Sequence, residues 1–281
     1  MEELKIDKEF YDAFKKLLVG LEDYNKEIVI IGGLANALYQ YHEYGQNSRL
    51  GVLATKDLDV LTSDKVTMLN KSIIDGLTEQ GFVVDPKPVE DKIITKFTLP
   101  DTNFEIEFLC PMKGGDPDKE GKRQLVKEIQ DGVKAQPLRY LDLALFDPWT
   151  INSKNIPELN DIDIDIQIPN PGAYLIQKFI IKDRRKPAFA QKDCFYIYEL
   201  LLKFRDNFDI LKGCIDDLVV KNTQKGGYRK VRGFKEDFKE YFASTLAEGT
   251  LRCHRELKAR DYDSIEIEDV QAVFDLFFEE L

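Results

Sequence analysis

The sequence predicts an α+β protein in which a mixed β-sheet core is followed by a C-terminal helical bundle. Two observations lead to this expectation. Up to about residue 168, short apolar or alternating runs typical of strands are interspersed with amphipathic segments of helical period. From Asn170-Pro171, a helix cap followed by a first-turn proline, apolar clusters recur at helical spacing. We therefore expect a core domain over residues 1–168 and a helical domain over residues 169–281.

The elements of the core alternate in type along the chain. Residues 7–21 and 64–80 place apolar side chains at three- and four-residue spacing, which predicts a helix in each segment. A turn over Pro100-Asp101-Thr102-Asn103 predicts a hairpin. Apolar or alternating runs predict strands over residues 28–31, 56–61, 82–84, 92–99, 103–109 and 133–138.

Residues 27–62 contain the most informative motif in the chain. An apolar run stops at Gly32-Gly33, a helix-like segment follows, and Asp57 and Asp59 then lie in an alternating strand. Because side chains alternate along a strand, the two aspartates project from the same side, about 7 Å apart along the backbone. Carboxylates at that separation converge on divalent cations, and Mg²⁺ prefers such oxygen ligands while keeping positions open for substrate phosphates.

The paired glycines supply the second half of this candidate site. A backbone without Cβ atoms lets a phosphate approach closely, and a helix that starts after Gly33 directs its free N–H groups at that anion. A glycine turn that can bind phosphate, followed by two carboxylates that can bind a metal ion, predicts nucleotidyl transfer.

This stretch resembles the nucleotidyltransferase superfamily, whose pattern is Gly-Gly or Gly-Ser, a helix, and Asp-x-Asp on the next strand. Within it, over residues up to about 200, the chain is most similar to AbiEii-type abortive-infection toxins and related minimal nucleotidyltransferases. The resemblance implies a nucleotidyltransferase-type core, Mg²⁺ as cofactor and an NTP as substrate. Many members place a serine after the glycines to hold the terminal phosphates, whereas this chain has Leu34. Phosphate binding is therefore expected to rely on backbone amides and on basic side chains elsewhere.

The resemblance also implies a third acidic residue, on the strand over residues 103–109. Glu105 and Glu107 share one face of that strand, and apolar side chains occupy the other. In the family, an acid on this strand completes the metal site and accepts the proton of the attacking hydroxyl. We favour Glu107, because an acid immediately before an apolar pair matches the family pattern, and Glu105 is the alternative.

Residues 171–204 carry the remaining part of the resemblance. AbiEii-like proteins have a helix with a lysine, then basic residues, then Lys-Asp opening the next helix. Lys178, Arg184 or Arg185, and Lys192-Asp193 follow this order. The lysines are expected to neutralise a triphosphate, and Asp193 to orient a lysine or reach a substrate hydroxyl. The family often has another aspartate three residues later, where this chain has Tyr196. The predicted nucleotide-binding residues are thus Gly32, Gly33, Lys178, Lys192 and Asp193.

Two further runs, residues 184–186 and 221–239, are rich in lysine and arginine. In the second run Gly226, Gly227 and Tyr228 lie among the basic residues, and flexible glycines with an aromatic ring fit contact with an RNA backbone. Solvated charged loops have the same composition, so both interpretations stay open here.

Residues 161–168 repeat the Asp-x-Asp pattern without a glycine pair before it. Perfect alternation of acid and hydrophobe is typical of an edge strand with one wet face. We therefore expect Asp161, Asp163 and Asp165 to face solvent in a structural strand.

Composition excludes several classes of protein. Two histidines are too few for most zinc sites and His-based triads, and a net charge of −11 argues against broad, non-specific nucleic-acid binding. The apolar runs are too short to cross a bilayer, no signal peptide is visible, and the four cysteines have no paired spacing. These features predict a cytoplasmic protein with no membrane partner.

Together the motifs predict an Mg²⁺-dependent nucleotidyltransferase in which Asp57 and Asp59 hold the metal and Glu107 acts as ligand or base. It would transfer an NMP from an NTP to an acceptor hydroxyl. By the resemblance, the acceptor is tRNA or another RNA, and the protein is the toxin of a toxin–antitoxin pair with a cognate antitoxin. One alternative keeps the chemistry but modifies a small molecule such as an aminoglycoside, or a protein. Another is a non-catalytic interaction protein on the same scaffold.

Overall fold

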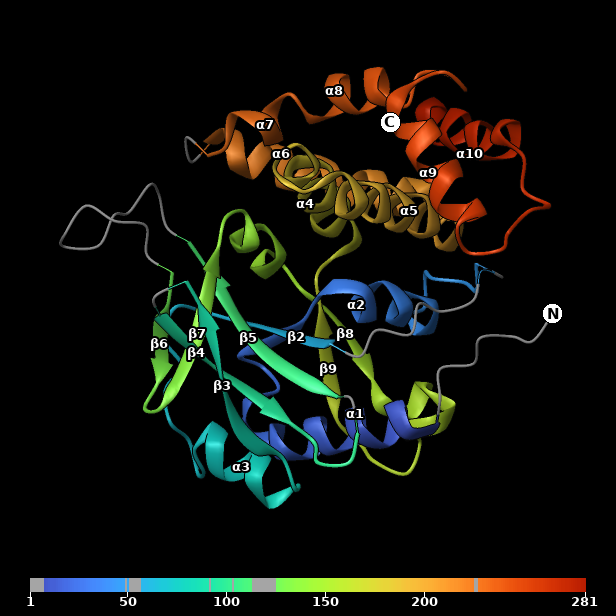
Figure 1. Ribbon diagram of the computed structural model, residues 1–281. Helices are drawn as coiled ribbons and strands as arrows, with labels where there is room; N and C mark the ends of the chain where they lie inside the picture. The colour runs from blue at the N-terminus through green and yellow to red at the C-terminus, as the bar shows by residue number, and fades with distance from the viewer. Residues whose placement is uncertain are drawn as a thin grey trace. The chain divides into compact units, whose positions relative to one another are not determined.

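The computed structural model describes residues 8–48, 50, 57–90, 92–102, 104–112, 125–224 and 227–281. The chain divides into two compact units: the first comprises Met1–Tyr41 and Gly51–Pro169, the second His42–Leu50 and Asn170–Leu281. A mixed sheet dominates the first unit and helices the second (Figure 1), which confirms the predicted α+β class. Among the described residues, none of the helices has the length and hydrophobicity of a membrane-spanning segment.

The central sheet of the first unit combines parallel and antiparallel pairs. Its strands are ordered β1 (Ile28–Ile30), β2 (Asp57–Thr62), β5 (Glu105–Pro111), β4 (Lys92–Thr98) and β3 (Val83–Val89). The second half of β5 also pairs with β7 (Val133–Leu138), which pairs with β6 (Lys127–Gln130). β2 runs parallel to β5, whereas β1 pairs with β2 and β3 with β4 in the antiparallel sense. β8 (Trp149–Asn152) and β9 (Asp165–Ile168) form a separate antiparallel pair.

One face of this sheet is an apolar core. Leu58 and Val60 of β2 point to this face together with Ile106 and Phe108 of β5, and all four side chains are buried. Helices α1 (Lys8–Gly20) and α3 (Ile73–Glu79) lie along this side of the sheet (Figure 1). The rings of Phe10 in α1 and Phe104 before β5 pack 5.5 Å apart. Burial of these side chains fixes which face of β2 and β5 is left for polar residues.

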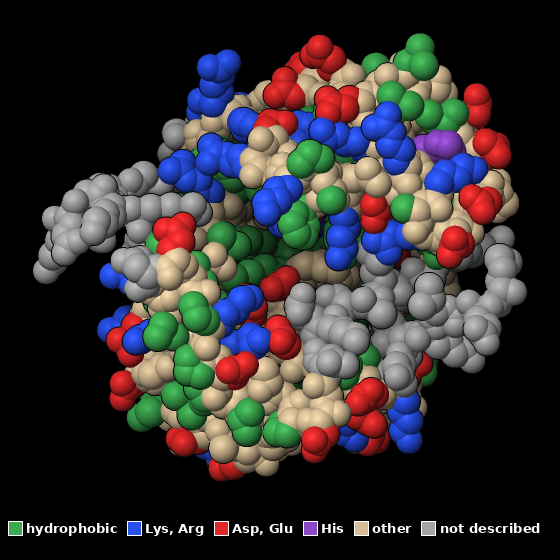
Figure 2. Space-filling view, viewed as in Figure 1, with side chains coloured by type: hydrophobic (Ala, Val, Ile, Leu, Met, Phe, Trp, Pro, Cys, Tyr) green, Lys and Arg blue, Asp and Glu red, His purple; other side chains and the backbone are tan. Residues whose placement is uncertain are grey.

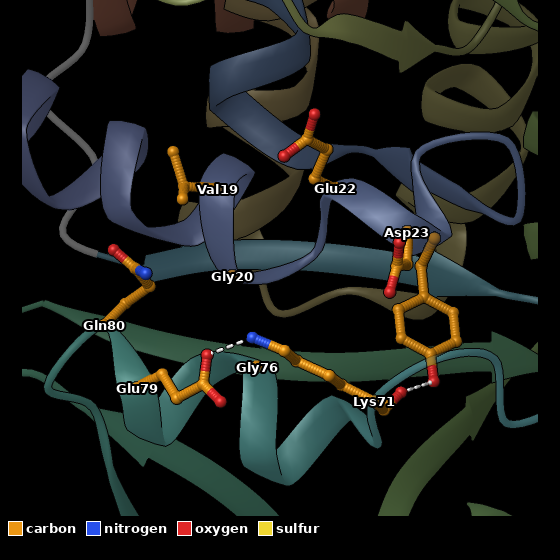
Figure 3. A pocket seen from close by; sticks show the side chains of 9 residues that line it. Val19, Gly20, Glu22, Asp23, Lys71, Gly76, Glu79 and Gln80 are labelled. Carbon is orange, nitrogen blue, oxygen red and sulfur yellow. Dashed lines mark hydrogen bonds and ion pairs between the residues drawn. The ribbon is translucent and has the colours of Figure 1, made fainter.

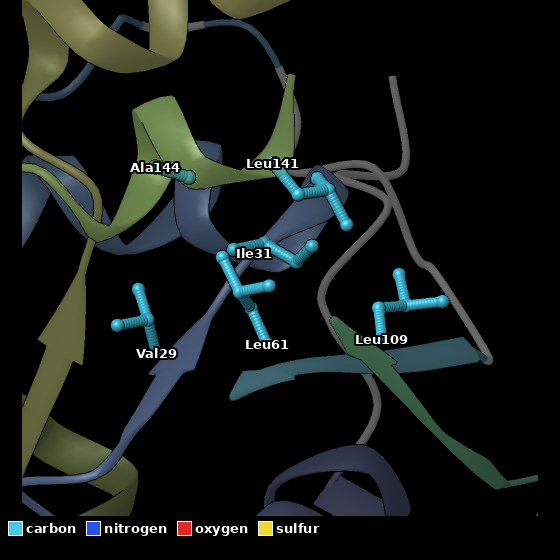
Figure 4. Packing of buried hydrophobic residues seen from close by; sticks show 6 residues of the cluster. All are labelled: Val29, Ile31, Leu61, Leu109, Leu141 and Ala144. Atoms are coloured by element: carbon cyan, nitrogen blue, oxygen red, sulfur yellow. The ribbon is translucent and has the colours of Figure 1, made fainter. Parts of the chain in front are cut away.

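The opposite face is apolar only towards the ends of β2 and β5. There Leu61 and Leu109 pack with Val29, Ile31, Leu141 and Ala144 in one cluster (Figure 4). Leu141 and Ala144 belong to the short 3₁₀ helix η3 (Leu141–Leu145). Because Asp59 and Glu107 come two residues before Leu61 and Leu109 on the same face, the cluster borders them and excludes water on that side.

Three elements have boundaries that differ from those predicted from the sequence. The helix expected over residues 64–80 begins only at Ile73, because Ser72 caps it by accepting a hydrogen bond from the N–H of Asp75 at 3.0 Å. The strand expected over residues 82–84 continues to Val89 despite its prolines, since β3 is the last strand in the sheet order. The strand expected over residues 161–168 begins at Asp165.

The second unit is helical after Asn170, as predicted, and the side chain of Asn170 caps the first helix by accepting from the N–H of Ala173 at 2.8 Å. Its core is aromatic, with the rings of Phe242 and Phe274 stacked 4.1 Å apart. Residues 42–50 join this unit, because the N–H of Gln46 donates to the carbonyl of Lys203 at 3.0 Å. The helices are α4 (Pro171–Ile181), α5 (Pro187–Lys203), α6 (Phe208–Gln224), α7 (Arg229–Arg232), α8 (Phe234–Tyr241), α9 (Glu248–Lys258) and α10 (Ile267–Glu280).

Candidate active site

The parallel pairing of β2 and β5 brings the predicted acids into register. Asp59 lies opposite Glu107, and the backbone of residue 57 lies opposite Glu105. Paired residues on neighbouring strands have Cα atoms about 4.8 Å apart and point to the same face. The side chains of Asp59, Glu105 and Glu107 are each half-buried, so their carboxylates are reachable from solvent. The side chain of Asp57 lies outside the described residues.

The glycine turn fits closely against this acid pair. Gly32 is the first residue of α2 (Gly32–Leu38) and has a φ of +73°, a conformation that favours glycine. A Cβ at this position would lie 2.6 Å from Oδ2 of Asp59, so a larger residue would displace that carboxylate. The N–H of Ile31 donates to the carbonyl of Asp59 at 3.1 Å and holds the turn against β2. The backbone of Gly32 therefore lies directly against the carboxylate of Asp59.

Two lysines, which the sequence analysis missed, share the face of the acids. Lys96 of β4 donates to Glu105 at 2.6 Å and lies 3.6 Å from Asp85, and Lys87 of β3 is ion-paired with Glu107. The hydrogen bond to Glu105 raises the pKa of Lys96 above its usual range. The signal for Lys87 was the alternation of residues 85 and 87 in a strand that the prolines at 86 and 88 disguised, whereas Lys96 lies in the strand predicted over residues 92–99.

The acids on this face fit a magnesium ion in their chemistry. Among the described side chains, no group of three or more His, Cys, Asp and Glu residues is gathered closely enough to hold a metal. Asp59 and Glu107 nevertheless lie opposite one another on one face, and residue 57 is in register with Glu105. Carboxylate oxygens are the ligands that Mg²⁺ prefers, so the donors on this face suit that ion.

In the second unit, the predicted nucleotide-binding residues form a buried ion pair. Nζ of Lys178 donates to Oδ1 of Asp193 at 3.1 Å, and both side chains are almost fully buried. Nε of Arg185 lies 3.1 Å from the other carboxylate oxygen of Asp193. Because a buried charge is costly without a partner, Asp193 holds Lys178 in one orientation.

Tyr196 separates the two predicted lysines of this unit. Nζ of Lys178 lies 5.1 Å from the centre of the Tyr196 ring, and Nζ of Lys192 lies 5.6 Å from it. These distances are within cation–π range. The ring of Tyr196 therefore lies within reach of both cations without neutralising either of them.

The two basic runs of the sequence meet in this unit. Asp183 of η6 (Lys182–Arg184) accepts a hydrogen bond from Lys230 of α7 at 2.8 Å. Arg184, Arg185 and the basic ends of α7 are exposed around this contact. Figure 2 shows Lys and Arg side chains gathered over the helical part of the chain. Lys225 and Gly226 of the second run lie outside the described residues.

The repeated Asp-x-Asp segment has no such surroundings. Asp161, Asp163 and Asp165 are exposed, as predicted. Asp163 accepts hydrogen bonds from Lys154 and Asn152, and Asp161 pairs with Lys15. The hydrogen bonds from these partners are the main cause that lowers the pKa of Asp161 and of Asp163.

A cavity of about 230 Å³ lies between α1 and α3 (Figure 3). The two helices approach closely at Gly20 and Gly76, where a Cβ on Gly76 would lie 2.1 Å from the carbonyl of Gly20. Lys71 is the lysine lining this cavity, and it is paired with Glu79. The cavity contains no predicted site residue, and it belongs to the helices that cover the apolar face of the sheet.

Comparison with known protein families gives a match that covers the sheet and the first helices of the second unit. A family model described as nucleotidyltransferase matches residues 15–211. The match spans β1, β2 and β5 of the sheet and α4 and α5 of the helical unit. No curated protein and no solved structure matches the chain.

Proposed function

The chain belongs to the nucleotidyltransferase family, whose members transfer a nucleotidyl group from an NTP, and we propose that it does so with Mg²⁺ held on the acidic face of β2 and β5. The metal ligands in this proposal are Asp57, Asp59 and Glu107. The observation that carries it is the contact of Gly32 with Asp59, where a Cβ would lie 2.6 Å from the carboxylate. A backbone without a Cβ lets the carboxylate of Asp59 lie against this turn and lets a phosphate approach the same place.

Glu107 is the third carboxylate in this proposal. Its register opposite Asp59 supports the choice, and so does the different environment of Glu105. Glu105 is hydrogen-bonded to Lys96, which is only 12% exposed, whereas the partner of Glu107, Lys87, is 44% exposed. Glu105 is therefore committed to a lysine inside the sheet face, and Glu107 is the more easily recruited ligand.

The chain's own groups have defined roles in the transfer. The acceptor oxygen forms a bond to the α-phosphorus, the bond from that phosphorus to pyrophosphate breaks, and a carboxylate oxygen of Glu107 takes the acceptor's proton. The backbone at Gly32 and Gly33 lies against the phosphates, while Lys178, Lys192 and Asp193 bind the nucleotide. Bound Mg²⁺ supplies charge neutralisation and activates the attacking hydroxyl.

A transfer assay tests the chemistry directly. Purified protein is incubated with each of four α-³²P-labelled NTPs, Mg²⁺ and total RNA, and label in the RNA is measured. Wild-type protein should label RNA from at least one NTP, and D57A and D59N should not. Equal labelling by wild type and both variants would end the proposal.

We further propose that the acceptor is RNA, on the grounds of how charge is distributed. Residues 178–193 contain six Lys or Arg and two Asp, a net +4, and residues 221–239 contain seven Lys or Arg and two acids, a net +5. The total of −11 then leaves −20 on the rest of the chain. The ion pair of Asp183 with Lys230 joins the two segments. Concentrated positive charge in an acidic protein fits a polyanion such as tRNA.

As the biological role, we propose that the protein is the toxin of an AbiEii-like toxin–antitoxin pair. If it holds, expression of wild-type protein arrests growth, D59N does not, and RNA from arrested cells carries extra nucleotides. Growth arrest by D59N as strong as by wild type would contradict a role through nucleotidyl transfer. Resistance to an aminoglycoside without arrest would favour a small-molecule acceptor instead.

A further inference from the structure

Lys87 is a charged side chain that the proposed reaction leaves without a role. It lies on β3, the last strand in the sheet order, and its ammonium group is ion-paired with the carboxylate of Glu107. Lys87 is 44% exposed, whereas Glu107 is 14% exposed. The ammonium group of Lys87, which solvent reaches, is therefore paired with Glu107, the more buried of the two glutamates that β5 places opposite β2.

The neighbouring lysine provides a comparison within the same sheet face. Lys96 is 12% exposed and lies between two carboxylates, 2.6 Å from Glu105 and 3.6 Å from Asp85. It is fixed by two anions and by burial. Among the described residues, Lys87 has one carboxylate partner, Glu107, and it reaches water. Because water screens an exposed ion pair, this pair contributes little to stability. Of the two lysines, Lys87 is the one that can exchange its anion.

The backbone around Lys87 confines such an exchange to the side chain. Pro86 and Pro88 flank it, and each proline ring fixes its own φ angle. The lysine side chain is a flexible four-carbon stem with three donors at its end. Its Nζ can thus turn from one anion to another while β3 keeps its register with β4.

Building on the function proposed above, on which this step rests, we propose that Lys87 is a displaceable counter-ion that becomes a phosphate-binding residue. Its ammonium group neutralises Glu107 while the metal site is empty of cation. When Glu107 would instead bind the metal ion, Nζ of Lys87 would pair with the non-bridging oxygens of the substrate's triphosphate. No covalent bond changes, and one ion pair replaces another.

Calorimetry without turnover tests this exchange. The full chain is titrated with Mn²⁺ alone, and then with inorganic tripolyphosphate at saturating Mn²⁺, a probe that all four NTPs share. K87M should bind Mn²⁺ about tenfold more tightly, because a competing cation is gone, and tripolyphosphate about tenfold more weakly. K87R, which keeps the charge, should stay near wild type for tripolyphosphate.

K71M is the matched control. Lys71 also forms an exposed ion pair, with Glu79, but it lines the cavity between α1 and α3. It should leave both affinities at wild-type values. If K87M matches wild type in both titrations while D59N and E107Q lose Mn²⁺ binding, the role of Lys87 is wrong and the proposed function stands. Wild-type protein that binds no Mn²⁺ at all would contradict both.

Discussion

The Asp-x-Asp segments at residues 57–59 and 161–165 have different surroundings. Asp59 lies beside a glycine turn and opposite Glu107 on a parallel strand. Asp163 and Asp165 lie at the surface, where the amide of Asn152 donates to both carboxylates. Alternating acids are therefore not a metal site in themselves. Asp59 is in register with Glu107 and lies against the turn at Gly32, whereas Asp165 is in register with Asn152, an amide.

Neutralising one aspartate in each segment gives the largest expected contrast. D59N should lower kcat/KM for nucleotidyl transfer by on the order of a thousandfold, because a charged metal ligand becomes an amide. D163N, at an exposed position paired with Lys154, should leave the rate unchanged. Steady-state transfer assays measure both. Comparable losses in the two variants would remove the distinction between the segments.

The acids of β5 refine the comparison within the active face. E107Q should lower transfer about a hundredfold or more, as expected for loss of a ligand or general base. E105Q should change the rate less than tenfold and instead cost about 1 kcal/mol of stability, since Lys96 loses its closest partner. Urea unfolding next to the rate measurement separates the two effects. The reverse pattern would make Glu105 the third carboxylate.

Gly32 tests whether the turn itself belongs to the site. G32A should reduce transfer about a hundredfold, because its Cβ displaces the carboxylate of Asp59. It should also cost about 1–2 kcal/mol, since alanine is strained at this positive φ. The matched control is G213A in α6, where an added Cβ meets nothing within 4 Å. In a helix interior that change should stabilise the protein by about 0.5–1 kcal/mol.

The smallest expected effect is a pH dependence of stability at Lys96. Hydrogen bonding to Glu105 raises the pKa of Lys96 in the folded protein. The pair therefore contributes fully below the ordinary lysine pKa of 10.5, and its contribution is lost as pH rises through the higher, folded value. Between pH 9 and pH 11.5, wild type should lose more unfolding free energy than E105Q does. Parallel curves for the two proteins would show that the bond contributes nothing.

The sequence was sufficient to predict the general fold and the glycine–aspartate motif, because both depend on local patterns. Asn170-Pro171 marks the start of the helices by its own chemistry, and Gly32 and Asp59 are close in the chain. Which glutamate faces Asp59 depends instead on how β5 slides along β2. That register is fixed by burial of Ile106 and Phe108, which a single strand does not reveal.

Other features were not predicted, because contacts between segments distant in the chain override the local sequence pattern. Residues 64–71 have the apolar spacing of a helix, but the N–H of Val66 donates to the carbonyl of Ile129 in another segment. The helix therefore begins only after its N-cap, Ser72. Lys87 was hidden by two prolines that normally end a strand and are tolerated at a sheet edge. The pairing of Asp183 with Lys230 joins segments 47 residues apart. No spacing rule relates such positions.

Crystals soaked with Mn²⁺ and a non-hydrolysable NTP analogue test the central claim most directly, through the anomalous scattering of manganese. The proposal predicts an anomalous peak bound by the carboxylates of Asp59 and Glu107, with the phosphates against Gly32 and Gly33. A peak at Asp163 and Asp165, with none at Asp59, would contradict it.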